Sequence, residues 1–319
     1  MTVCPKRSGF SLSSKLSVAG VAALTGAWLA TTVLSAQQTY VHLNPVIARL
    51  TAGQPFYGLI TNDFSLSRAQ QAARTRGVDF IYADMEHAPL DMPALYSFLL
   101  GMTDKAAIIK KGNLQPDVAL FMRAAPEVEQ TQWIVQQALD IGLHGFIFNG
   151  VETAEQARLA VSYMRYPAER GSKYPEPAGK RGSGAGIAQW TWGLSGAEFR
   201  RHADLWPLNP DGDLIAIMMV ETARGMTNMD AIMSTPGVSA VFIGAGSDIS
   251  TSMGVSIGDP QVEQARQNIL AACKRHIVAC GLTVTSADDL VRRVKEGWKM
   301  IRTTEDIVVA GRTALGDTF

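Results

Sequence analysis

Short apolar runs alternate along the chain with longer segments in which apolar and polar residues recur at helical spacing. The apolar runs predict strands, because a parallel strand buried on both faces is apolar at nearly every position. These runs span residues 56–60, 80–84, 119–124, 145–149, 214–221, 240–244, 282–285 and 298–303. The segments between them predict helices at residues 65–76, 92–102, 129–141, 153–165, 229–234, 260–280 and 287–296.

This order of elements favours an α/β fold of the (β/α)8 TIM-barrel type. Eight predicted strands have helices between most of them, and no Gly-x-Gly-x-x-Gly motif follows the first strand. A doubly wound nucleotide-binding sheet is therefore the weaker interpretation. In such a barrel the residues at the carboxyl ends of the strands line the active site.

The first 36 residues are set apart from this pattern. Basic residues precede an apolar stretch, 16–34, which ends in small residues at Ala36. This order predicts a secretory signal peptide (1–36) that is cleaved near Ala36, so that the protein is exported to the periplasm or the medium. An uncleaved membrane anchor is the alternative, since the stretch approaches the ~18 apolar residues that a span needs. Residues 37–319 then form one barrel domain, interrupted by a long insertion at 166–213.

Charge and cysteine content narrow the expectations further. The formal net charge is +0, so neither nucleic acid nor an anionic membrane surface is expected as a partner. Cys273 and Cys280 both fall in the predicted helix 260–280. Two helical turns would separate them by roughly 10 Å, which is too far for a disulfide. We therefore expect a domain of this size to rely on its core rather than on disulfide bonds.

Two connections, 103–118 and 166–213, are much longer than usual, and such loops are generally functional or disordered. The second contains a Gly-rich basic stretch, followed by Trp190, Trp192 and Trp206. We expect it to form a lid, with the tryptophans covering the barrel mouth or a neighbouring subunit. A phosphate cradle is the weaker alternative, because the stretch lacks a Walker pattern.

A carboxylate stands at the end of each of two successive strands. The run 214–220 stops at Glu221, and the run 240–243 continues through a short Gly-rich segment to Asp248. An isolated carboxylate at a buried strand end needs a partner or a metal ion. Two such acids on neighbouring strands could share one divalent cation. Alternatively, Glu221 pairs with Arg224, and Asp248 caps the following helix.

Two further strand ends carry ionisable residues. The strand 80–84 leads into Glu86 and His87, and a histidine flanked by acids at a barrel mouth is a candidate base, although a lone histidine is more often structural. Arg123 ends the strand 119–124, where its planar fork suits a bidentate carboxylate. Its alternative partner is Glu86, in a salt bridge inside the mouth.

Several of these stretches resemble the HpcH/HpaI aldolase/citrate lyase family over roughly residues 56–254. They read DMEHAP, ALDIG, MMVETARG and GVSAVFIGAGSDIS in this chain. The resemblance implies a TIM barrel of the phosphoenolpyruvate/pyruvate-binding type and a homo-oligomer, a trimer or a hexamer. It also implies a metal-dependent class II aldolase of the 2,4-dihydroxyhept-2-enedioate aldolase kind. Such an enzyme cleaves a 4-hydroxy-2-oxo acid to pyruvate, or a related 2-oxo acid, and an aldehyde.

The resemblance also assigns roles to individual residues. Glu221 and Asp248 would hold Mg²⁺ or Mn²⁺, with Co²⁺ as a further candidate. His87 would handle the proton of the aldol hydroxyl, and Asp140, in ALDIG, would hold that histidine.

Substrate binding is assigned in the same way. Arg123 would grip the carboxylate and carbonyl of the 2-oxo acid, and Gly244 and Ser247 would complete the substrate site. No Schiff-base lysine is then required, since Lys110 and Lys111 fall in a polar loop.

Three departures from the family pattern affect the substrate more than the fold. The family's Gly-Pro-Ala-Asp becomes Gly-Ala-Gly-Ser-Asp before Asp248, one residue longer, and the proline-containing end of the fourth strand reads Phe148-Asn149-Gly150. Export is unusual for such an enzyme. An exported, non-catalytic 2-oxo-acid-binding protein is therefore the alternative function. It would keep Arg123 and the two metal ligands but would not need His87, whose presence favours an enzyme.

Overall fold

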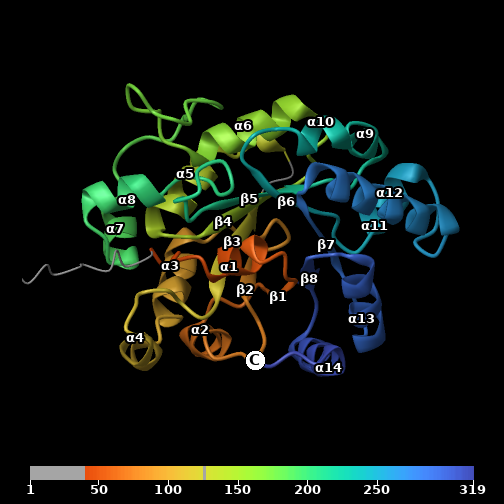
Figure 1. Cartoon of the computed structure of the whole chain (residues 1–319), viewed down its shortest axis with the longest axis horizontal. Coiled ribbons are helices and arrows are strands. Elements are labelled where there is room, and N and C mark those ends of the chain that lie inside the picture. The colour runs from red at the N-terminus through yellow and green to blue at the C-terminus, as the bar shows by residue number, and fades with distance from the viewer. Residues whose placement is uncertain (1–39, 125–126) are drawn as a thin grey trace, which may run out of the picture. The chain divides into compact units, whose positions relative to one another are not determined.

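Eight parallel strands close into a barrel in which each strand pairs with the next along the chain and β8 pairs with β1 (Figure 1). The computed structural model describes residues 40–124 and 127–319, so the predicted signal peptide lies outside the described residues. The strands are β1 Phe56–Thr61, β2 Phe80–Met85, β3 Ala119–Ala124, β4 Gly145–Phe148, β5 Ile215–Met219, β6 Val238–Phe242, β7 Ala279–Thr283 and β8 Met300–Arg302. The barrel predicted from the apolar runs is confirmed.

Helices surround the barrel (Figure 1). They are α1 Pro45–Thr51, α2 Leu66–Ala72, α3 Met92–Gly101, α4 Lys105–Lys111, α5 Gln132–Ile141, α6 Ala154–Met164, α7 Gly186–Trp192, α8 Gly196–His202, α9 Ala223–Thr227, α10 Met229–Met233, α11 Ser247–Met253, α12 Pro260–His276, α13 Ala287–Glu296 and α14 Glu305–Leu315, with the 3-10 turn η1 Val128–Gln130. Within residues 40–124 and 127–319, no helix has the length and apolarity that crossing a membrane requires.

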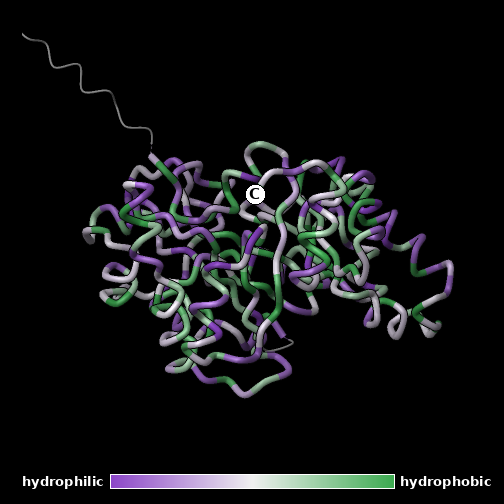
Figure 2. The backbone as a smooth tube through the Cα atoms, turned by 90° about the horizontal axis from the view of Figure 1, so that it is seen from below, coloured by the Kyte–Doolittle hydropathy of each residue, from purple (hydrophilic) through white to green (hydrophobic). Residues whose placement is uncertain are grey.

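The strands are apolar at consecutive positions because both of their faces are buried. On β3, Ala119 and Phe121 belong to the core inside the barrel, whereas Leu120 and Met122 pack in the core shared with the helices. Figure 2 shows apolar segments running through the middle of this domain. Gly58 on β1 is required here, since a Cβ at that position would lie 2.1 Å from the Phe80 ring.

Both long connections run from a helix to the next strand. The first joins α3 to β3 and holds α4, and the second joins α6 to β5 and holds α7 and α8. In a (β/α)8 barrel, helix-to-strand connections lie at the N-terminal ends of the strands, opposite the active-site mouth. Trp192 stacks on His144, directly before β4, and the Trp206 backbone N–H donates to Leu214, directly before β5. The prediction that these tryptophans cover the barrel mouth is therefore wrong, whereas their covering a neighbouring subunit stays a prediction.

The cysteine prediction is also wrong, because the predicted helix continues too far. The helix α12 ends at His276, and Ile277 adopts a left-handed conformation with φ 56° that reverses the chain into β7. Cys280 thus lies on β7, with its Cα 5.9 Å from that of Cys273, and the two residues form a disulfide. The same error placed the seventh strand at 282–285 instead of Ala279–Thr283.

The chain enters the domain at the N-terminal end of the barrel. Asp213, which is fully buried just before β5, accepts hydrogen bonds from the Tyr40 hydroxyl and the Leu43 backbone N–H and contacts His42 Nδ1 at 2.9 Å. The Tyr40 ring stacks on His202 of α8. Residues 40–43 are therefore fixed against the second long connection.

Candidate active site

The carboxyl ends of the strands surround a cleft of about 260 Å³. It collects the side chains that the sequence placed at strand ends, together with residues from β1, β6 and β8. Its lining consists of Ile60, Tyr82, Asp84, His87, Arg123, Met219, Phe242, Gly244, Ala245, Ser247, Asp248 and Arg302. Five of the predicted site residues, His87, Arg123, Gly244, Ser247 and Asp248, are thus brought together. Glu221 adjoins them, since its Oε2 lies 3.8 Å from the position that a Cβ on Gly244 would take.

Arg123 is held by two acids of the strand β2 and its extension. Its Nε and Nη2 donate to the two carboxylate oxygens of Asp84 at 3.1 and 2.9 Å, and Nη1 lies 2.8 Å from Glu86. The guanidinium also lies over the Tyr82 ring, 5.1 Å from its centroid. The salt bridge to Glu86 that the sequence left open is therefore present. The bidentate partner, Asp84, was not among the predicted site residues.

The Arg123–Asp84 pair stays charged despite its burial. Burial is the largest single influence and acts to raise the pKa of Asp84, but the hydrogen bonds and charge of Arg123, with the Glu86 backbone N–H, together outweigh it, and the pKa is lowered. Burial acts to lower the pKa of Arg123, but the bonds to Asp84 raise it overall. Each group supplies the counter-charge that a buried ion requires.

Glu221 lacks such a partner. Its burial, reinforced by the charges of Asp248 and Glu86, raises its pKa to about 7. Arg224, the alternative partner suggested by the sequence, instead pairs with Glu152 at 3.2 Å. Among the described residues no cation forms a salt bridge with Glu221, so its charge is compensated poorly until a cation enters the cleft.

The loop from β6 to α11 carries Asp248. Gly244 and Gly246 both have positive φ, 57° and 89°, and Gly246 is the N-cap of α11. Asp248 lies in the first turn of α11, where its side chain is exposed and accepts a hydrogen bond from Ser247 Oγ at 3.0 Å. Asp248 is therefore not the N-cap, although a carboxylate is favourable in a first helical turn.

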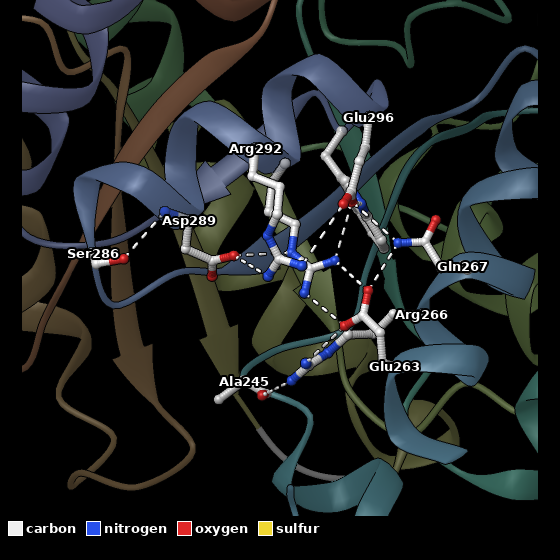
Figure 3. Close-up of polar contacts among 10 residues, drawn as sticks. Ala245, Glu263, Arg266, Gln267, Ser286, Asp289, Arg292 and Glu296 are labelled. Atoms are coloured by element: carbon white, nitrogen blue, oxygen red, sulfur yellow. Dashed lines mark hydrogen bonds and ion pairs between the residues drawn. The ribbon is translucent and has the colours of Figure 1, made fainter. Parts of the chain in front are cut away.

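The extra residue of this loop is supported from α12. Arg266 Nη2 donates to the Ala245 carbonyl at 2.8 Å, and a Cβ on Gly246 would lie 2.5 Å from the same nitrogen (Figure 3). Arg266 in turn lies 3.4 Å from Glu263, which accepts two hydrogen bonds from Arg293 of α13 at 2.6 and 2.7 Å. The hydrogen bonds from Arg293 are the main reason that the pKa of Glu263 falls to about 2. A charged network thus connects the Asp248 loop to two helices.

His87 stands at the rim of the cleft, and 71% of its side chain is exposed. Its Nε2 lies 3.5 Å from Glu86. The prediction that Asp140 holds it is wrong: Asp140 contacts Gln136 and, at 2.9 Å, Arg181. Asp140 belongs to the last turn of α5, which leads to the N-terminal end of β4, whereas His87 follows the carboxyl end of β2.

The oxygen-rich part of the cleft suits a hard divalent cation. Burial is the main reason that the pKa of Glu221 is raised, and the charge of Asp248 adds to it; a cation between the two acids would remove that repulsion. Carboxylate oxygens without sulfur ligands are the donors that Mg²⁺ and Mn²⁺ prefer. Residues 40–124 and 127–319 contain no cluster of three or more His, Cys, Asp or Glu side chains arranged around a metal position. Two carboxylates supply fewer oxygens than such a cation takes, so a metal held by Glu221 and Asp248 would have coordination positions open for other ligands.

Arg302 is a second, half-buried cation of the cleft that the sequence did not single out. It ends β8, lines the cleft and donates from Nε to Thr283 at 2.8 Å. Burial lowers its pKa. The arginine at the end of a short strand was visible in the sequence, but nothing local showed that β8 closes the barrel beside β1.

Comparisons with known proteins agree with this geometry. The family model for the HpcH/HpaI aldolase/citrate lyase family matches residues 64–310. The hydroxypyruvate/pyruvate aldolase of Delftia acidovorans is 31% identical over 280 residues, covering 86% of this chain and 91% of that enzyme. The 2-keto-3-deoxy-L-rhamnonate aldolase of Salmonella gallinarum is 32% identical over 241 residues, covering 75% of this chain and 76% of that enzyme. A crystal structure of an HpcH/HpaI family protein from Burkholderia cenocepacia matches with 30% identity and a TM-score of 0.68, covering 86% of this chain and 98% of that one.

Proposed function

This chain belongs to the HpcH/HpaI aldolase/citrate lyase family and is an aldolase-type carbon–carbon lyase, and we propose that Glu221 and Asp248 hold its divalent cation. Its substrate is a 4-hydroxy-2-oxo acid, and its products are pyruvate, or a related 2-oxo acid, and an aldehyde. The observation that carries this proposal is the uncompensated Glu221 carboxylate, with its pKa raised to about 7, beside Asp248 and a cleft that contains Arg123.

Arg123 orients the substrate in this scheme. Its two bonds to Asp84 fix the plane of the guanidinium, so that its remaining N–H groups can meet the substrate carboxylate in one orientation. When bound, the cation supplies Lewis-acid stabilisation of the enolate. The cleft lining contains no lysine that could form a Schiff base, and Lys110 and Lys111 lie on α4, in a connection at the opposite end of the barrel.

His87 carries the proton. It takes the proton of the 4-hydroxyl, the C3–C4 bond breaks, the aldehyde leaves, and the electron pair remains on C3 as an enolate that is then protonated. Glu86 lies 3.5 Å from His87 Nε2, at the rim of the cleft, and contacts the ring there. The relatives compared above are named as aldolases, so the non-catalytic binding protein is not retained as a second function.

Product analysis of the purified chain tests the proposal. It is incubated with pyruvate, a panel of aldehydes and Mg²⁺, Mn²⁺ or Co²⁺, after exhaustive chelation. We expect aldol products only when a metal is returned, and His87→Ala should lose ~10²–10⁴-fold in turnover while keeping its metal affinity. His276→Ala, which replaces a half-buried histidine of α12 that pairs with Asp230 and does not line the cleft, serves as the control. Full activity after chelation, or near-normal turnover of His87→Ala, would reject the mechanism.

Export after cleavage near Ala36 is part of the same proposal. The Cys273–Cys280 disulfide supports it, because disulfides persist mainly in oxidising compartments. A homo-oligomer, trimer or hexamer, remains the expectation. Intact-mass analysis of the protein from its native host decides the first point: a chain that retains residues 1–36 and fractionates with membranes would favour the anchor.

A further inference from the structure

A second cavity, of about 190 Å³, lies at the N-terminal end of the barrel. It is partly open to solvent and is bordered by α3, α4 and α7 and by the residues just before β3 and β4, and Figure 1 shows these helices on one side of the barrel. Apolar side chains make up most of its wall, among them Leu99, Met102, Ile108, Leu114, Val118 and Leu120. None of the residues that line this cavity also lines the cleft at the mouth of the barrel.

His144 is the polar group that this cavity leaves unsatisfied. The residue is 5% exposed, and neither Nδ1 nor Nε2 has a hydrogen-bond partner among the described residues. Trp192 lies parallel to the imidazole, 5.3 Å between centroids at 3°, and its Nε1 donates to the Gly142 carbonyl, so the imidazole packs against a fixed ring. Buried polar groups are almost always hydrogen-bonded, and an unmade bond is costly.

The charge state of the cavity limits what can satisfy this histidine. Burial lowers the pKa of His144 to about 4, so the ring is neutral at pH 7, with one N–H donor and one acceptor nitrogen. The charged residues of the wall already have partners: Lys111 is 2.6 Å from Asp117, and Asp104 is 3.1 Å from Arg74. A charged ligand would therefore be desolvated without gaining a counter-ion.

Size and lining define the ligand. An apolar protein cavity of about 150 Å³ stays dry and binds benzene, and this cavity is somewhat larger. We propose that the cavity binds a neutral monocyclic aromatic alcohol of the phenol class, with its ring among the apolar side chains and its hydroxyl hydrogen-bonded to His144.

The cover of the cavity permits entry. None of the residues of α4 is buried, and Ile109 on this helix is 81% exposed, so α4 contributes little to the core. The cavity is partly open to solvent beside this helix. Trp190 of α7, 69% exposed and part of the cavity wall, lies at the boundary with solvent.

Calorimetric titration of the full chain with phenol and with benzene tests the proposal. We expect saturable binding of both, with phenol about two- to tenfold tighter, the range that one neutral hydrogen bond provides. His144→Leu should lose this preference and still bind benzene. His276→Leu, which replaces a half-buried histidine of α12 outside this cavity, should bind both compounds as wild type does.

A second variant covers the case in which His144→Leu fails to fold. Leu114 is 46% exposed and lines the cavity, so Leu114→Trp should fill the cavity and abolish the binding of both compounds without disturbing the barrel. Absence of saturable binding to wild type would overturn the proposal. Undiminished phenol preference in His144→Leu, or phenol binding by Leu114→Trp as tight as wild type, would also overturn it.

Discussion

The two ends of the barrel deal with buried polar groups in opposite ways. At the mouth, strand-to-helix loops bring charged groups from several strands together, and Arg123 and Asp84 stay ionised by pairing. At the N-terminal end, two long helix-to-strand connections form an apolar cover, and His144 is kept neutral. Burial alone therefore does not determine the charge state. The counter-ion that the neighbouring strands provide determines it.

The same contrast operates within the mouth. Asp84 and Glu221 are both carboxylates at strand ends, and burial acts to raise the pKa of each. Asp84 has Arg123 and its pKa is lowered, whereas Glu221 faces Asp248 and Glu86 and its pKa rises to about 7. One acid is a fixed structural charge. The other is a group that gains most from an incoming cation.

The largest effect should follow from removing the fixed charge pair. Arg123→Met leaves Asp84 buried without a counter-ion, which typically costs about 3–5 kcal/mol in the free energy of unfolding. Turnover should also fall by at least ~10²-fold because the substrate carboxylate loses its orientation. Chemical denaturation and kcat/KM measure the two effects.

A matched surface pair is the control for this experiment. Arg224, 67% exposed, pairs with Glu152 outside the cleft, and Arg224→Met should cost only about 0–1 kcal/mol. Equal losses of stability in the two variants would remove the distinction between a buried and an exposed pair at this end of the barrel.

The next effect concerns Glu221 and pH. Because its pKa is about 7 in the folded chain, above its ordinary 4.5, protons compete with the metal at low pH. Metal affinity should therefore rise about tenfold between pH 6 and pH 8. In the metal-free chain the stability of the fold changes with pH in the opposite direction. Between pH 4.5 and 7 the folded chain holds the Glu221 proton more tightly than the unfolded chain does, so the free energy of unfolding falls as the pH rises through this range.

Calorimetric titration of metal at the two pH values measures this effect. Asp248→Asn removes one of the two proposed carboxylate ligands, so this variant should bind metal more weakly. It also removes a charge that raises the pKa of Glu221, so the metal affinity should depend less on pH. An affinity that does not change between pH 6 and pH 8 would mean that Glu221 is not a ligand.

The smallest effect should come from the network behind the Asp248 loop. Arg266→Gln removes the donor to the Ala245 carbonyl, and metal affinity should weaken about two- to tenfold, the contribution of one hydrogen bond. Arg266→Lys should recover part of the loss. Arg292→Gln, which removes a pair with Asp289 and leaves the loop untouched, is the control. Identical metal affinities in the glutamine variants and wild type would show that the loop holds its own position.

The sequence predicted the barrel because apolar runs report burial on both faces, and it predicted the mouth because strand ends converge there. The wrong predictions concern pairs of residues whose distance depends on how the barrel closes. Asp140 was assigned to His87 although a residue at the end of a helix lies at the other end of the barrel. The reversal at Ile277, where no glycine marks the turn, hid the Cys273–Cys280 disulfide.

Other contacts carried no local signal at all. Asp84 stands in the same strand-end motif as His87, but only the pairing of β2 with β3 shows that it takes Arg123. Arg266 reaches Ala245 across 21 positions of sequence, and its role depends on how α12 packs behind the loop. His144 is one polar residue at the start of an apolar run, and the sequence does not show that the two long connections enclose it.

The anchoring of residues 40–43 on Asp213 has a practical consequence for handling the enzyme. Because Tyr40 lies at the N-terminal end of the barrel, a tether attached at this residue would be anchored on the side away from the substrate cleft. A bead or an electrode coupled at that position would leave diffusion of the oxo acid and the aldehyde unobstructed. The architecture thus suits immobilised synthesis by N-terminal attachment.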